Sequence, residues 1–104
     1  MVSASEKGRQ FENYVKRKLV ARGYLVTRSA GSKGVFDLVA IPPLSEQPGI
    51  LGIQCKATGK ITKHEKEKVI NTAKKYGLIP VLATKFNRRV ILINLETEQL
   101  LEGL

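Results

Sequence analysis

The spacing of apolar residues alternates along this chain between a helical period and short extended runs, and this alternation restricts the fold more than any other feature. From about Ser5 to Arg22 apolar residues recur every three or four positions, which predicts an amphipathic helix with a strongly basic polar face. Gly23 follows at the position of a helix C-cap. Thr62 and Glu65 have the spacing of a capping box, and they predict the start of a second helix that ends near Gly77.

Five short runs rich in β-branched and apolar residues lie between and after these helices, and they predict strands. They cover residues 24–28, 35–41, 50–57, 79–86 and 90–95. The PPLSEQPG stretch at 42–49 predicts a loop, and residues 96–104 are expected to form a tail with a short helical turn. The order α-β-β-β-α-β-β within 104 residues predicts an α/β protein with a single domain over residues 1–104.

Positive charge predominates in this chain, with 18 Lys and Arg against 9 Asp and Glu and a net charge of +9. All of the basic residues lie in residues 1–89, whereas residues 90–104 carry acids and no base. A polyanionic partner such as DNA or RNA is the expected reason for this excess. The alternative is a solvated basic surface that serves solubility or thermal stability.

The cysteine and histidine content excludes two kinds of stabilising site. Cys55 is the only cysteine, so an internal disulfide cannot form, and with the single His64 it cannot build the usual four-ligand zinc site. The apolar stretches are too short for a membrane span, and the N-terminus lacks the apolar core of a secretory signal. We therefore expect a soluble, cytoplasmic protein with no membrane partner.

An isolated acid inside an apolar strand is the first candidate for chemistry. Asp37 lies in the run VFDLVAI, and a buried carboxylate is costly unless something pairs with it. In the next strand Gln54 and Lys56 lie two residues apart and hence on one face, while Ile53 and Cys55 point to the other. An acid facing a polar residue and a lysine is typical of a divalent-metal phosphodiesterase centre. These residues on a solvated strand face are the alternative.

Two further segments favour the metal-centre hypothesis. The loop RSAGSKG at 28–34 combines Arg28, Ser29, Ser32 and Lys33 with small residues, so its backbone and hydroxyl groups could approach a phosphate closely. Glu12 lies on the first helix and could add a second carboxylate. An ordinary hairpin loop, and a helical ion pair of Glu12 with its i+4 neighbour, are the corresponding alternatives.

Four segments carry a resemblance to a known family. KGRQFE at 7–12, GYLVTRSAGSKGVFDLVAI at 23–41, IQCK at 53–56 and KKYGLIPVLATKF at 74–86 resemble, in order, the archaeal-type Holliday junction resolvases of the PD-(D/E)XK nuclease superfamily. The resemblance implies a restriction-endonuclease-like core with a central mixed β-sheet flanked by helices. It also implies a homodimer that binds four-way DNA junctions and nicks two opposed strands with Mg²⁺, for which Mn²⁺ can substitute.

The resemblance also implies roles for individual residues. Asp37 would be the principal metal ligand and a catalytic residue, Glu12 an outer contributor to the metal site, and Cys55 a ligand through its backbone carbonyl only. Lys56 would be the catalytic lysine. Contacts to the scissile phosphate would come from Arg28 and the loop serines Ser29 and Ser32, with Ser32 favoured as a catalytic residue. Further DNA contacts are assigned to the basic residues Lys7, Arg9, Lys33 and Lys63.

The chain departs from the family pattern at Gln54, where these enzymes carry Glu, and at Asn13, where they usually carry Arg. An amide oxygen can still bind Mg²⁺ but brings no charge, so Gln54 predicts weaker metal binding. Glu65 could supply the missing carboxylate from the second helix. Two other functions stay open: a catalytically weakened accessory protein that binds branched DNA, and a duplex-specific repair or restriction-type nuclease on the same fold.

Overall fold

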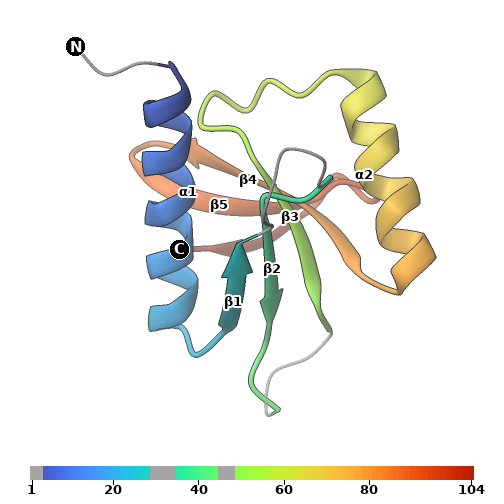
Figure 1. Cartoon of the computed structure of the whole chain (residues 1–104), viewed down its shortest axis with the longest axis horizontal. Coiled ribbons are helices and arrows are strands. Elements are labelled where there is room, and N and C mark those ends of the chain that lie inside the picture. Colours follow the sequence, from blue (N-terminus) through green and yellow to red (C-terminus); the bar gives the residue numbers. More distant parts are fainter. Residues whose placement is uncertain (1–3, 29–34, 45–48) are drawn as a thin grey trace.

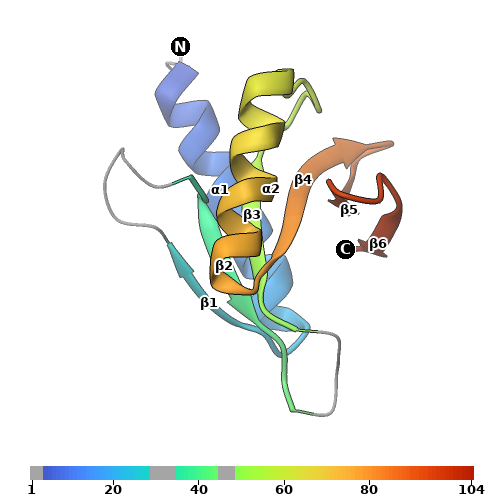
Figure 2. The same ribbon diagram turned by 90° about the vertical axis from the view of Figure 1, so that its right-hand side faces the viewer.

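In the part of the chain that the structure describes, six strands form one mixed sheet, and one helix covers each of its faces (Figures 1 and 2). The computed structural model describes residues 4–28, 35–44 and 49–104 of the chain. Its elements are, in order, α1 (Ala4–Ala21), β1 (Leu25–Arg28), β2 (Leu38–Ile41), β3 (Leu51–Cys55), α2 (Lys63–Tyr76), β4 (Ile79–Phe86), β5 (Arg89–Asn94) and β6 (Leu100–Gly103). The predicted α/β class and the order α-β-β-β-α-β-β are confirmed, with β6 as an additional strand.

The strands lie side by side in the same order in the sheet as in the sequence. Every neighbouring pair is antiparallel except β3 and β4, which run parallel with Gln54 opposite Leu82. Parallel neighbours need a long crossover connection, and α2 provides it. The sheet is therefore mixed, as the family resemblance implied, and β3 lies near its centre.

The two faces of the sheet carry separate apolar layers. Val15 and Leu19 of α1 are fully buried against one face, in a cluster that also contains Ile53 of β3. Val69 and Ala73 of α2 are buried against the other face. Figure 2 shows α2 in front of the sheet and α1 behind it. Among the described residues no helix is long and apolar enough to cross a membrane.

Local signals set the ends of α2. The hydroxyl of Thr62 accepts the Glu65 N–H at 3.1 Å, and the Glu65 carboxylate accepts the Thr62 N–H at 3.1 Å, so the predicted capping box is confirmed. Gly77 ends the helix in the left-handed region, with φ of 70°, as expected of a C-cap glycine.

The tail differs from the expected helical turn. Residues Leu100–Gly103 form strand β6, which pairs antiparallel with β5, with Leu92 opposite Glu102. The side chain of Asn94 accepts the backbone N–H groups of Glu96 and Thr97, which turns the chain back along β5. The prediction was wrong because the free edge of β5 offers a ladder of backbone partners that a helical turn would leave unused.

Candidate active site

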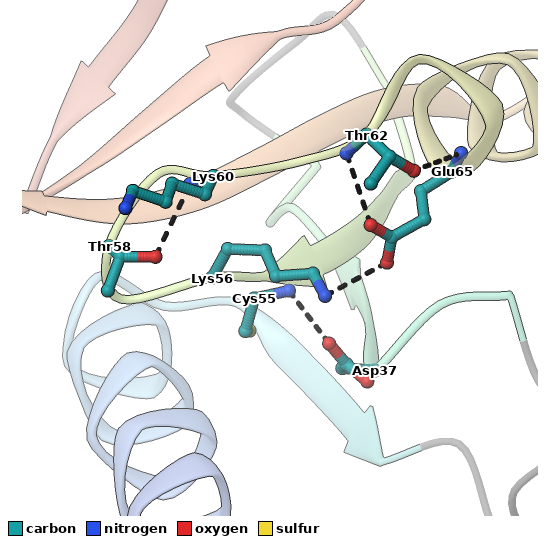
Figure 3. Close-up of polar contacts among 7 residues, drawn as sticks. All are labelled: Asp37, Cys55, Lys56, Thr58, Lys60, Thr62 and Glu65. Carbon is teal, nitrogen blue, oxygen red and sulfur yellow. Dashed lines mark hydrogen bonds and ion pairs between the residues drawn. The ribbon is translucent and has the colours of Figure 1, made fainter.

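The site is built where β3 ends, beside the start of β2. The Asp37 N–H donates to the Ile53 carbonyl at 2.8 Å, and Asp37 Oδ2 accepts the Cys55 N–H at 2.8 Å (Figure 3). One residue thus joins the two strands through both its backbone and its side chain. The carboxylate of Asp37 is held in place at the end of the β2–β3 ladder.

Burial raises the pKa of Asp37 above its usual value of 3.8. The hydrogen bond from Cys55 and the charges of Lys56 and Arg28 act in the opposite direction, while the charge of Glu65 raises the pKa further. The net upward shift shows that the surrounding positive groups do not fully compensate for the water that this carboxylate has lost.

The alternation of side chains along β3 agrees with the sequence pattern. Ile53 belongs to the apolar cluster under α1, and Cys55 packs against that cluster. Gln54 points the other way and lines a small cavity of about 180 Å³ with Glu65, Lys68, Val69 and Val35. Burial raises the pKa of the Cys55 thiol, which disfavours the thiolate and any nucleophilic chemistry at this residue.

Glu12 lies on α1, close enough to Asp37 for their charges to interact. Arg28 of β1 donates from Nη2 to Glu12 Oε1 at 3.4 Å and from Nη1 to Asn13 Oδ1 at 3.3 Å. Burial raises the pKa of Glu12, and so does the nearby charge of Asp37, against the opposing effect of Arg28. Two carboxylates therefore share a partly desolvated region, with one arginine bound to Glu12.

Lys56 follows β3 directly, and its side chain reaches α2. Its Nζ lies 2.9 Å from Glu65 Oε2, while Glu65 Oε1 accepts the Thr62 N–H (Figure 3). These two interactions, that with Lys56 first, lower the pKa of Glu65 to about 2. The sequence predicted Glu65 as a capping-box residue and as a possible substitute carboxylate for the metal. The structure shows it paired with Lys56, a contact that the capping-box spacing alone did not indicate.

The other predicted site residues fall into two groups. Ser29, Ser32 and Lys33 lie outside the described residues. Lys7 and Arg9 are exposed on the first half of α1, and Lys63 is exposed at the start of α2. Figure 1 shows that both helices begin at the end of the sheet where β3 finishes, so the first turns of α1 and α2 lie at the same end of the molecule as the C-terminal end of β3.

The donor set for a metal is smaller than in a full carboxylate cluster. Among residues 4–28, 35–44 and 49–104 no group of three His, Cys, Asp or Glu side chains is arranged to hold a metal ion. The carboxylates of Asp37 and Glu12 are available as donors, whereas that of Glu65 is paired with Lys56. Gln54 places an amide where the resemblance implied Glu.

The fold and the site are consistent with the PD-(D/E)XK nuclease superfamily: a mixed sheet lies between two helices, with Asp37 beside a Gln-x-Lys strand end. The chain belongs to the archaeal Holliday junction resolvase (Hjc) family, whose sequence profile matches residues 3–102. The resemblance seen in the sequence is thereby confirmed.

Two individual proteins illustrate the relationship. The chain is 41% identical over 92 residues to the crossover junction endodeoxyribonuclease Hjc of Methanocaldococcus jannaschii, which covers 85% of this chain and 65% of that protein. It thus spans slightly less than two thirds of the length of this curated relative. The 1.6 Å structure of Hjc from Archaeoglobus fulgidus, a Holliday junction resolvase, superposes with a TM-score of 0.72 at 22% identity, over 93% of this chain and 80% of that one. This structural likeness supports the fold.

Proposed function

We propose that this protein is a Holliday junction resolvase, a structure-specific endonuclease that binds four-way DNA junctions and nicks opposed strands by metal-dependent phosphodiester hydrolysis. The observation that carries the proposal is the placement of Asp37 against the backbone of Cys55, directly before Lys56. Membership of the resolvase family and the name of the Methanocaldococcus relative support the same activity.

The donor chemistry of the site fits a hard divalent cation. Asp37 and Glu12 offer carboxylate oxygens, Gln54 an amide oxygen and Cys55 a backbone carbonyl, all ligands that Mg²⁺ and Mn²⁺ accept. The raised pKa values of both acids reflect desolvated negative charge, which a cation at this position would neutralise. We therefore propose Mg²⁺ as the natural cofactor, with Mn²⁺ able to substitute.

Each group of the site would have a separate role in cleavage. A bound metal would polarise the scissile phosphate and lower the pKa of an attacking water. Lys56 would offset phosphate charge and orient that water. Arg28, with Ser29 and Ser32, would contact the scissile phosphate, and Ser32 is the favoured catalytic residue among them. Contacts to the flanking DNA backbone would come from Lys7, Arg9, Lys33 and Lys63.

The charge distribution favours binding of this substrate. The net charge of +9 would attract DNA over a distance of about 10 Å at 0.1 M salt. The acids of the tail are neutralised locally: Glu102 pairs with Arg22 at 2.7 Å, Glu96 pairs with Lys74 at 3.1 Å, and Glu98 pairs with Lys66. They therefore oppose DNA binding less than unpaired acids would.

We propose that the active form is a homodimer. Resolving a junction needs two coordinated cuts, and a two-fold dimer carries two identical active sites at a set separation. With DNA as its substrate the dimer would act in the cytoplasm, or in the host cytoplasm if the protein is viral.

Gln54 favours one second candidate. Because its amide brings no negative charge, the same surface could bind branched DNA while cutting it poorly, as an accessory protein would.

A cleavage assay with three substrates tests these functions. Purified protein is incubated with labelled four-way junction, linear duplex or single strand, in Mg²⁺, Mn²⁺ or EDTA. Paired, metal-dependent nicks confined to the junction are the expected result. Junction binding without product would instead support the accessory role, and cleavage of linear duplex would support a repair or restriction-type nuclease.

A further inference from the structure

Lys56 is held both by its backbone and by the end of its side chain. Its backbone N–H donates to the Ala83 carbonyl of β4 at 2.9 Å, which anchors the residue to the sheet. Its Nζ lies 2.9 Å from Glu65 Oε2 on α2. The lysine therefore spans the gap between the central strand and the start of α2, as the close-up in Figure 3 shows.

The connection between these two anchors is also constrained. The Ala57 carbonyl accepts the Thr84 hydroxyl at 3.3 Å, and Gly59 adopts a φ of 75°. A Cβ atom at Gly59 would lie 3.2 Å from Thr84 Oγ1, so the loop passes close to β4. The position of Glu65 relative to Lys56 is thus determined by the packing of the loop as well as by the ion pair.

The two carboxylate oxygens of Glu65 have different partners. Oε1 completes the capping box by accepting the Thr62 N–H, and Oε2 faces Lys56. The cap needs only the first oxygen, and a glutamine in its place would supply that oxygen equally well. The negative charge of Glu65 is therefore not required for the capping hydrogen bond, but it is well placed for the lysine.

Gln54 and Glu65 line the same cavity. Gln54, two residues before Lys56, carries no charge, and the carboxylate of Glu65 reaches the lysine from α2 instead. We propose that Glu65 is the positioning residue of Lys56. Fixed by the capping box of α2, its carboxylate holds the Lys56 ammonium group at the end of β3 and gives the lysine an anionic partner, which the neutral Gln54 cannot be. The catalytic consequence of this inference rests on the proposed nuclease function.

The test compares two matched variants of the full-length protein. Glu65→Gln keeps the acceptor for Thr62 but removes the charge that faces Lys56. Glu67→Gln makes the same change at an exposed position of the same helix. We expect Glu65→Gln to reduce the maximal junction-nicking rate roughly 10- to 100-fold, because small displacements of a catalytic group are costly, with junction affinity unchanged. Glu67→Gln should nick at the wild-type rate.

Two readouts separate positioning from a general structural effect. In a Lys56→Gln background, adding Glu65→Gln should cause no further loss of rate, since no lysine remains to be oriented. In the metal-free protein, the ¹⁵N signal of the Lys56 ammonium group should shift in Glu65→Gln and stay unchanged in Glu67→Gln. Independent, multiplicative losses of rate, or a Lys56 signal that does not respond to Glu65→Gln, would overturn the inference.

A failure of the proposed function gives a different result. If the wild-type protein nicks no DNA with any metal, the resolvase proposal is wrong, and the Lys56 ammonium signal alone then decides whether Glu65 positions the lysine. Thr62→Ala provides the control for the helix cap, because it removes the hydroxyl acceptor of the Glu65 N–H. It should lower the melting temperature while leaving the Lys56 signal in place.

Discussion

Replacing Gly52 by alanine should disturb both the stability of the fold and the placement of Asp37. A Cβ atom at Gly52 would lie 2.7 Å from Cε1, 2.8 Å from Cζ and 2.9 Å from Cδ1 of Phe36. That ring is only 9% exposed and packs in the cluster that contains Val69 and Ala73 of α2. It therefore has little room to withdraw.

This overlap should lower the free energy of unfolding. Overpacking of a core typically costs about 1–3 kcal/mol, and for a domain of this size each kcal/mol lowers Tm by about 4–8 °C. We therefore expect Gly52→Ala to lower Tm by about 4–24 °C, measured by circular dichroism. Because Phe36 directly precedes Asp37, the variant should also nick junctions more slowly than its remaining folded fraction would predict.

A second glycine supplies the matched control. Gly103 lies in β6, and an added Cβ there would meet nothing within 4 Å, so Gly103→Ala should leave Tm nearly unchanged. Replacing the Phe36 ring by the smaller leucine side chain, in Gly52→Ala/Phe36→Leu, should recover part of the lost stability, because it relieves the clash. Equal Tm values for Gly52→Ala and Gly103→Ala would refute the close approach of Gly52 to Phe36.

The remaining predictions concern the charge of the site. Asp37→Asn should abolish nicking yet still shift four-way DNA in a gel; retained nicking would remove Asp37 from the mechanism. The same variant should raise Tm of the metal-free protein at neutral pH, since the raised pKa of Asp37 means that its ionised form disfavours folding; the gain should vanish below pH 3.8, where the acid is protonated in both states. Gln54→Glu should lower the Mg²⁺ concentration needed for half-maximal nicking, because it adds a charged ligand; an unchanged or higher requirement would indicate that Glu65 or another group already supplies that charge. Junction binding should weaken steeply with added salt as condensed counterions are released, and a flat response would contradict a phosphate-dominated interface.

Much of the candidate site could be predicted from the sequence because it depends on neighbouring residues. The alternation along a strand indicated that Gln54 faces away from Ile53 and Cys55, and the cavity on the α2 side bears this out. An isolated acid in an apolar run marked Asp37 as a residue in need of a partner. The identity of that partner, the backbone N–H of Cys55, depended on how β2 and β3 pair.

Other features of the site depend on contacts between distant segments. Glu12 could have paired along its own helix, but Arg28 reaches it from β1, 16 residues away. Asn13 departs from the family pattern, and the structure gives it a hydrogen bond with the same arginine. Neither contact has a signature in residue spacing, because both arise from the packing of α1 against the sheet.

The succession of the two helices and first five strands, the caps of α2 and the basic character of the chain could be predicted, because they depend on interactions within a few residues or on composition alone. The formation of β6 by the tail and the pairing of Glu65 with Lys56 depend instead on the packed domain. The tail follows the free edge of β5, and the ion pair requires β3, the following loop and α2 to pack together. Such contacts are selected by the packing of the whole domain, so a local pattern can name the residues involved without showing which of them meet.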